Sequence, residues 1–255
     1  MIETIKLGEL SPDVVSLWGV VRIALGEKLS PEGLLEVASK LGKPEGFVLP
    51  KYRPAGFPPE VTLIDTHGDG VSAAPRGFGQ GWHQDSTYLA DPPQFTVLHS
   101  LEVPSSGGDT MFADTRPALR ALSEDDREAL KNTSLEHSVR DSYRISAKDA
   151  GRSLDELRRS LPSASHPAVF SHPRGGTSLW LSPLYTQGGL DERSRPLFER
   201  AMKEVVKTRT NYSWRAGEIL VWDNRVVLHA ASSYAGDQRR LMMRTMARDT
   251  GVGGK

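Results

Sequence analysis

Short runs of β-prone residues separated by turns fill the second half of the chain, and they constrain the fold more than any other feature. Runs of this length, bounded by Gly, Pro and small polar residues, are typical of strands. They comprise residues 177–181, 210–214, 218–222, 225–230 and 239–247, with earlier ones at 95–103 and 110–114. Many short strands and few helices predict a mainly β protein, a β-sandwich or jelly roll decorated with helices.

Helices are predicted between these strands by capping residues and by the helical spacing of apolar side chains. Ser30 is expected to be an N-cap, with Pro31 at the first helical position. Further helices are predicted to begin at Thr115 and near Ser123, and to span residues 191–208.

Three segments have less distinctive patterns. Residues 14–25 are predicted as a strand or a strand and turn. The Gly- and Pro-rich residues 69–81 lead into His83, so we expect a substrate lid there, with a surface loop as an equal alternative. Residues 134–165 are polar and contain several basic side chains, which predicts a solvated insertion or a mobile flap.

The composition excludes several classes of protein and site. The 255 residues include 32 Lys+Arg and 32 Asp+Glu, and this balance gives no electrostatic basis for binding nucleic acid or an anionic membrane. The absence of cysteine excludes disulfides and thiolate ligands, so a metal site must use histidine and carboxylate. No signal peptide and no apolar run near the ~18 residues of a membrane span are present, which predicts a cytoplasmic protein.

His83 and Asp85 are the first candidate metal ligands. In an extended segment the side-chain period is two, so both side chains point to the same face. Two histidines and one carboxylate with open positions opposite suit non-haem Fe(II), and His229 is the best candidate for the third ligand. A His-x-Asp triplet alone is also common on surface strands and loops, so a metal site is predicted only in combination with the segments that follow.

Four segments occur in an order and spacing that resemble the TauD/TfdA family of Fe(II)- and 2-oxoglutarate-dependent dioxygenases. They are WHQDSTY (82–88), GGDTMFAD (107–114), WDNRVVLH (222–229) and RRLMMR (239–244). The similarity covers roughly residues 80–249 and implies one dioxygenase domain over residues 1–255. The implied fold is a double-stranded β-helix, the cupin-like jelly roll.

The resemblance also implies a set of site residues. His83, Asp85 and His229 would ligate Fe(II), while Thr110 and Arg240 would bind the distal carboxylate of 2-oxoglutarate. An arginine presents a planar fork of donors that matches a carboxylate, and a threonine hydroxyl adds one more donor. O2 would be the other cosubstrate.

Arg240 and Arg244 are predicted to share the inner face of the last strand, because side chains two and four residues apart face the same way. A buried arginine is costly without an anion. We expect Arg244 to face the keto-acid end of the cosubstrate or an acidic group on the substrate. The alternatives are an exposed strand face for both arginines and, for Arg244, a salt bridge to a core carboxylate.

The predicted activity is oxidation, by default hydroxylation, of a small anionic or amino-acid-like substrate, with release of succinate and CO2. The same iron site could serve desaturation or cyclisation in a biosynthetic pathway. A zinc hydrolase would leave Thr110 and Arg240 unexplained, and a non-catalytic cupin-like binding protein would not need three ligands. Asp85 in place of a small residue favours oxygenation over halogenation. A homo-oligomer is compatible with the sequence.

Overall fold

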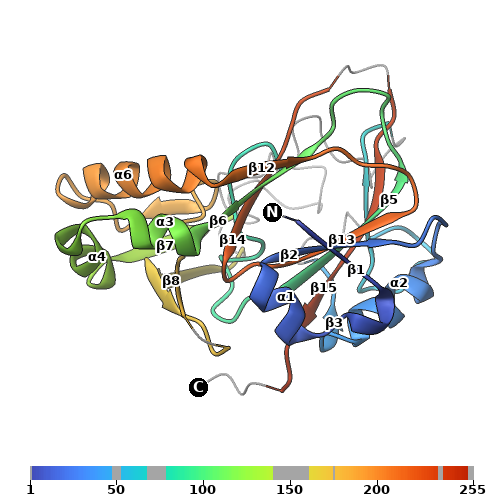
Figure 1. Ribbon diagram of the computed structural model, residues 1–255, viewed down its shortest axis with the longest axis horizontal. Helices are drawn as coiled ribbons and strands as arrows, with labels where there is room; N and C mark the ends of the chain where they lie inside the picture. The colour runs from blue at the N-terminus through green and yellow to red at the C-terminus, as the bar shows by residue number, and fades with distance from the viewer. Residues whose placement is uncertain are drawn as a thin grey trace.

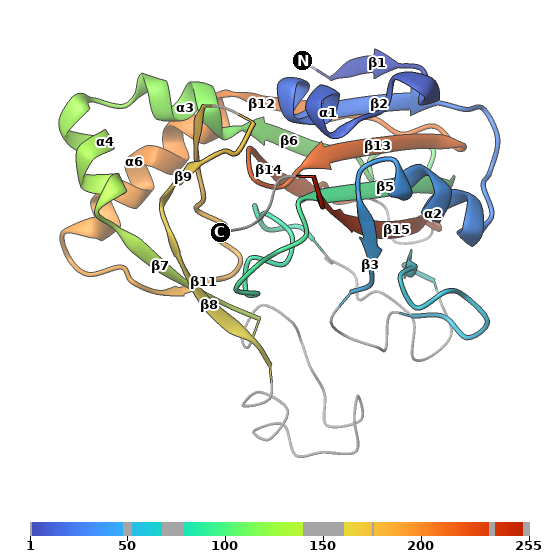
Figure 2. The same cartoon turned by 90° about the horizontal axis from the view of Figure 1, so that it is seen from below.

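A seven-stranded sheet forms one side of the central β structure (Figure 1, Figure 2). The computed structural model describes residues 2–47, 53–67, 79–139, 161–174, 176–234 and 238–251. The strands, in spatial order, are β1 (Glu3–Ile5), β2 (Val20–Ala24), β13 (Glu218–Asp223), β5 (Phe95–Glu102), β15 (Leu241–Arg248) and β3 (Lys43–Glu45). β4 (Thr62–Asp65) also pairs with β15. All neighbours are antiparallel except β1 and β2.

A three-stranded sheet packs against the inner face of the large sheet. It contains β12 (Arg209–Tyr212), β6 (Thr110–Asp114) and β14 (Val227–Ala231), with β6 in the middle. Phe112 and Val227 from this sheet join Leu98, Leu220 and Trp222 from the large sheet in one buried cluster. The candidate site lies against this buried cluster.

Alternation along the central strands decides which side chains reach that interior. On β5, Val97 belongs to the outer core, whereas Leu98 belongs to the inner one. On β15, Met243 is outer and Met242 is inner in the same way. Period-two alternation therefore places Arg244 on the inner face, as the sequence predicted.

Two N-terminal helices cover the outer face of the large sheet. They are α1 (Pro12–Trp18), which follows a short 3₁₀ turn, Leu7–Glu9, and α2 (Pro31–Ser39). The predicted start of α2 is confirmed, because the Ser30 hydroxyl accepts a hydrogen bond from the Gly33 amide. The predicted strand over 14–25 is wrong for its first part. Ser11 caps α1, Pro12 begins it, and strand β2 starts only at Val20.

A second layer lies beyond the three-stranded sheet (Figure 1). It contains the helices α3 (Thr115–Ala121), α4 (Glu124–Lys131) and α6 (Ser194–Lys207), close to their predicted positions. Beside them are the strands β11 (Thr186–Gly188), β7 (Ser134–Ser138) and β8 (Ser163–Pro167), and the pair β9 (Val169–Ser171) and β10 (Thr177–Leu179).

Two predicted segments are described only in part. The segment 134–165 was predicted as a solvated insertion or flap, but its ends form β7 and β8, which pair with each other. Its middle, 140–160, lies outside the described residues, as does most of the predicted lid at 69–81. Among the described helices, none has the length and apolar character needed to cross a membrane.

Candidate active site

His83, Asp85 and His229 meet at the inner edge of the two sheets. Each offers one ligand atom, and these atoms lie within 4.8 Å of one another. His83 Nε2 is 3.8 Å from Asp85 Oδ1, and His229 Nε2 is 3.6 Å from Asp85 Oδ2. All three residues are buried, with exposed fractions of 5%, 2% and 6%. No other group of this kind is found among the described residues.

Main-chain hydrogen bonds hold the two histidines side by side. The His83 amide donates to the His229 carbonyl at 2.9 Å, and the His229 amide donates to the His83 carbonyl at 2.8 Å. His83 Nδ1 lies 2.7 Å from the Gly81 carbonyl, so it must carry the proton. The lone pair of His83 is therefore on Nε2, the nitrogen nearest Asp85.

Burial and neighbouring charges set the protonation of the three groups. Burial lowers the pKa of His83, and it lowers the pKa of His229 to about 3 with help from the adjacent His83. Burial opposes ionisation of Asp85, but Arg244 and the two imidazoles outweigh it and lower the pKa of that carboxyl to about 2. At neutral pH the cluster is two neutral imidazoles and one carboxylate, the state in which all three can ligate a divalent cation.

Thr110 and Arg240 line a cavity that also contacts His83, His229 and Arg244. Arg240 lies just before β15 and Thr110 begins β6, so two separate sheets bring them together. Burial lowers the pKa of Arg240 to about 10, which leaves it charged at neutral pH. Within the described part of the chain, its guanidinium forms one hydrogen bond, from Nε to the Gly108 carbonyl at 3.0 Å.

The Thr110 hydroxyl is oriented by a tryptophan. Trp214 Nε1 donates to Thr110 Oγ1 at 2.9 Å, and an indole N–H can only donate. Thr110 therefore keeps its own proton for another acceptor. A neutral donor and a buried arginine beside one cavity are suited to an anionic oxygen group.

Arg244 lies closer to the ligand cluster than Arg240 does. Its Nη1 is 3.3 Å from Asp85 Oδ1, and its guanidinium lies 4.7 Å from the centre of the Phe47 ring. Sequence reasoning named a salt bridge to a core carboxylate as the alternative for Arg244. The structure shows that Arg244 forms an ion pair with a buried carboxylate, and this carboxylate belongs to the candidate metal ligand Asp85.

Three other buried histidines have hydrogen-bonding partners away from Asp85. His99 Nε2 accepts a hydrogen bond from the Leu29 amide, and His166 Nε2 donates to the Thr87 and Leu89 carbonyls. His172 Nε2 lies 2.9 Å from Asp223 Oδ2 in a fully buried pair. None of them joins the cluster around Asp85.

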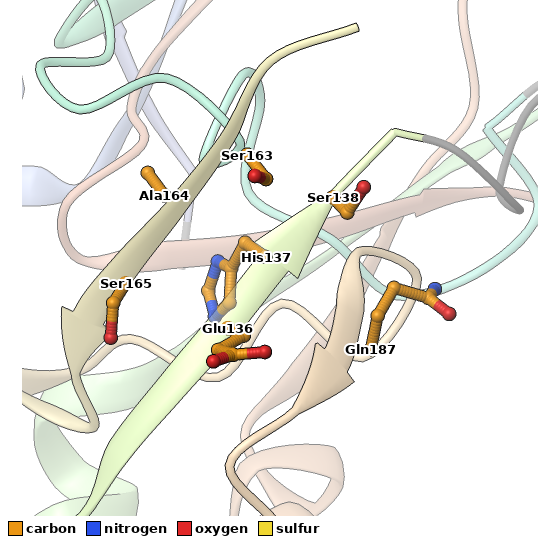
Figure 3. A pocket seen from close by; sticks show the side chains of 7 residues that line it. All are labelled: Glu136, His137, Ser138, Ser163, Ala164, Ser165 and Gln187. Carbon is orange, nitrogen blue, oxygen red and sulfur yellow. The ribbon is translucent and has the colours of Figure 1, made fainter. Parts of the chain in front are cut away.

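A second pocket, of about 350 Å³, lies against β7, β8 and β11 (Figure 3). Its described lining is Glu136, His137, Ser138, Ser163, Ala164, Ser165 and Gln187. These residues include one carboxylate and no arginine or lysine. Among these described lining residues there is no counterpart to Arg240 for a dicarboxylate, and none of them is a predicted site residue.

Comparison with known proteins agrees with this geometry. A family model described as taurine catabolism dioxygenase TauD, TfdA family, matches residues 16–246. The chain belongs to the TauD/TfdA family. It is accordingly an oxidoreductase that depends on Fe(II) and 2-oxoglutarate and uses O2.

Individual relatives are between 27% and 29% identical to this chain over the aligned residues. An α-ketoglutarate-dependent 2,4-dichlorophenoxyacetate dioxygenase of Burkholderia sp. is 27% identical over 239 residues, covering 88% of this chain and 80% of the relative. An alkylsulfatase of Acinetobacter baylyi is 29% identical over 183 residues, covering 68% of this chain and 58% of the relative.

A solved structure is similar over almost the whole chain. The crystal structure of AAD-2 in complex with Mn(II) and N-oxalylglycine has a TM-score of 0.76 at 20% identity, covering 99% of this chain and 95% of that one. This likeness concerns the fold, and with the TauD/TfdA match it confirms the predicted jelly roll.

Two residues that orient the site side chains were not found from the sequence. Thr96 donates to Asp85 Oδ2 at 2.8 Å, and Trp214 orients Thr110. Thr96 carried a signal, since it is a polar residue between the buried apolar residues Phe95 and Val97. Trp214 carried none, because its partner depends on how two sheets pack.

Proposed function

We propose that His83, Asp85 and His229 are the Fe(II) ligands of this dioxygenase. The observation that supports the assignment is the buried cluster of two neutral imidazoles and one ionised carboxylate, with ligand atoms within 4.8 Å. Nitrogen and oxygen donors of this kind fit the facial arrangement used by non-haem Fe(II), in which open positions remain for cosubstrates. Residues 1–255 act as a single dioxygenase domain in this proposal.

Thr110 and Arg240 are proposed to bind the distal carboxylate of 2-oxoglutarate. Arg240 is a buried cation with only a carbonyl acceptor among the described residues, and Thr110 has a hydroxyl proton to donate. Both line the cavity that reaches His83 and His229. A chelating keto acid could therefore contact the metal at one end and this pair at the other.

Arg244 is proposed to bind an anionic group close to the metal, either on the substrate or at the keto-acid end of the cosubstrate. Its side chain is buried beside Asp85, between the ligand cluster and the Phe47 ring. The two relatives described above are named for anionic compounds, a carboxylate and alkyl sulfates. We therefore propose a small anionic or amino-acid-like substrate, and hydroxylation as the reaction.

Bound Fe(II) with 2-oxoglutarate and O2 supplies the oxidising power that breaks a substrate C–H bond, with release of succinate and CO2. The chain's own residues bind and orient the reactants. Arg240 and Thr110 fix one end of the cosubstrate, Arg244 fixes a second anion, and the buried cluster limits access of water. Desaturation or cyclisation would use the same residues and would differ in the pose of the substrate.

The test measures succinate formed from 2-oxoglutarate with Fe(II) and O2, across a screen of small carboxylated, sulfonated, sulfated and amino-acid compounds. Wild-type protein should form succinate, and product mass should increase by one oxygen atom for hydroxylation. His83→Ala and His229→Ala should lose turnover and bind Fe(II) more weakly while keeping their circular dichroism. The exposed His67→Ala is the control. Turnover and Fe(II) affinity that persist in both variants would refute the assignment, and metal binding without any succinate would support a binding protein.

A further inference from the structure

Asp85 is hydrogen-bonded to a chain of buried polar side chains, and two of these, Thr96 and Asn224, do not line the cavity beside Thr110 and Arg240. Thr96 Oγ1 donates to Asp85 Oδ2 at 2.8 Å, and Asn224 Nδ2 donates to Thr96 Oγ1 at 2.8 Å. Thr96 lies on β5, opposite Trp222 of β13 and Met246 of β15. Thr96 and Asn224 are 0% and 3% exposed, so no bulk water can substitute for these bonds.

The direction of every bond in this chain is fixed by donors that cannot accept. Trp222 Nε1 donates to Asn224 Oδ1 at 3.0 Å, and the Asp85 amide donates to the same oxygen at 3.1 Å. An indole N–H and a backbone N–H have no acceptor role, so the Asn224 amide group can point only one way. Its NH2 group therefore faces Thr96.

This orientation of Asn224 fixes the direction in which the Thr96 hydroxyl donates. Its oxygen accepts from Asn224, so its one hydroxyl proton is available for Asp85. Arg244 meanwhile lies on the other oxygen, Oδ1, at 3.3 Å. The Asp85 carboxylate is thus held at both oxygens, by one donor from β5 and one from β15, which restricts rotation of its plane.

We propose that Thr96, oriented by Asn224, is a positioning residue that keeps Asp85 turned so that it ligates the metal through one oxygen. The inference rests on the proposed function, because it takes Asp85 as a ligand. A carboxylate that turned both oxygens to the cation would occupy a second coordination position. The Thr96 hydroxyl opposes that rotation, and so it preserves the open positions that a keto acid and O2 require.

The test compares Thr96→Val, Thr96→Ser and a matched control, Thr245→Val, using Co(II) and Mn(II) as probes. Valine keeps the shape of threonine and lacks the hydroxyl, whereas serine keeps the hydroxyl. Thr245 is a buried threonine on β15, and within the described part of the chain its hydroxyl bonds to the Met246 carbonyl alone, at 3.4 Å. Metal affinity is measured by calorimetry, and ligand geometry by the visible spectrum of the Co(II) protein.

Thr96→Val should bind both cations on the order of 10–100-fold more weakly and show an altered Co(II) spectrum, as is usual when a partner of a metal ligand is removed. Thr96→Ser should restore the affinity and the spectrum, and Thr245→Val should match the wild type. An unchanged affinity and spectrum in Thr96→Val would overturn the proposal. So would a Thr96→Ser variant as weak as Thr96→Val, because packing of the methyl group would then be responsible.

Asn224→Asp provides an independent measurement, since it replaces only the amide donor. Added negative charge near the site would by itself tighten cation binding. Loss of the Asn224 donor would instead turn the Thr96 hydroxyl away from Asp85 and weaken binding, which is the result we expect. Tighter binding would overturn the role of Asn224. If His83→Ala weakens Co(II) binding while Thr96→Val does not, the inference fails and the proposed function stands, whereas wild-type protein that binds neither cation would overturn both.

Discussion

Arg240 is a buried cation whose one acceptor among the described residues is the Gly108 carbonyl. We predict that Arg240→Leu raises the concentration of 2-oxoglutarate needed for half-maximal turnover about 30-fold or more, because loss of a buried charge-assisted pair costs roughly 2–5 kcal/mol. Succinate formation at varied 2-oxoglutarate measures this. The neighbouring Arg239 pairs with Asp65 and Glu102 near the surface, so Arg239→Leu is the control. Equal requirements in Arg240→Leu and the control would remove Arg240 from the cosubstrate site.

Substitution of Arg244 is expected to distinguish the binding of the substrate anion from the binding of 2-oxoglutarate. We predict that Arg244→Ala weakens substrate binding, while the affinity for 2-oxoglutarate stays near that of the wild type, because Arg240 and Thr110 remain. The two affinities are measured separately, by calorimetry with Mn(II) in place of Fe(II). A loss confined to 2-oxoglutarate would instead assign Arg244 to the keto-acid end. If neither affinity changes, the role of Arg244 is structural, as in its contact with Asp85.

At the scale of secondary-structure elements, the turn between α2 and β3 is fixed by one glycine. Gly42 has φ +144°, and a Cβ there would lie 1.9 Å from the Arg248 carbonyl oxygen at the end of β15. We predict that Gly42→Ala destabilises the protein by more than about 1 kcal/mol, since neither the conformation nor the space suits alanine. Gly33→Ala, inside α2 where a Cβ meets only ordinary contacts, should stabilise by about 0.5–1 kcal/mol. Urea unfolding of both variants tests the contrast, and equal effects would contradict it.

The elements also show where sequence reasoning succeeds and where it stops. Ser30 and Pro31 predicted the start of α2 because capping is a local interaction. Ser11 and Pro12 carry the same signal for α1, but the apolar run that follows obscured it. Strand β7 was missed because its polar side chains give no apolar alternation, and it is stabilised by pairing with β8.

At the scale of the whole molecule, buried histidines tie stability to pH. Burial lowers the pKa of five of them, His83, His99, His137, His166 and His229. For His137 the pKa falls from an ordinary 6.5 to about 3. As pH decreases, the unfolded chain therefore takes up protons first. The stabilising contribution is complete above pH 6.5 and is lost progressively below it, down to about pH 3.

We predict that His137→Phe weakens this acid sensitivity. Between pH 7.5 and 5.5 the metal-free variant should lose about 1.4 kcal/mol less unfolding free energy than the wild type, the value of one pKa unit. Urea unfolding at the two pH values measures the difference, with the exposed His67→Phe as control. A variant that keeps the full wild-type loss would show that His137 does not contribute to it.

The candidate site is predictable from the sequence only in part, because some of its contacts join residues that are distant in the sequence. His83, Asp85 and His229 follow from spacing and resemblance, because each sits in a segment with its own pattern. The contact of Arg244 with Asp85 and the hydroxyl of Thr96 depend on the register of β5 against β13 and β15. Register joins residues distant in sequence, and no local pattern records it.

The hydrogen bonds between the main chains of His83 and His229 affect how the enzyme would bind and lose its metal. Because two amide–carbonyl hydrogen bonds join these segments, the proposed ligands His83 and His229 are held side by side by the main chain itself. The pairing that brings the two histidines together is thus part of the fold and needs no bound cation. Removal of the metal by a chelator and its later return would then be an exchange at a preformed site, without unfolding and refolding of the chain.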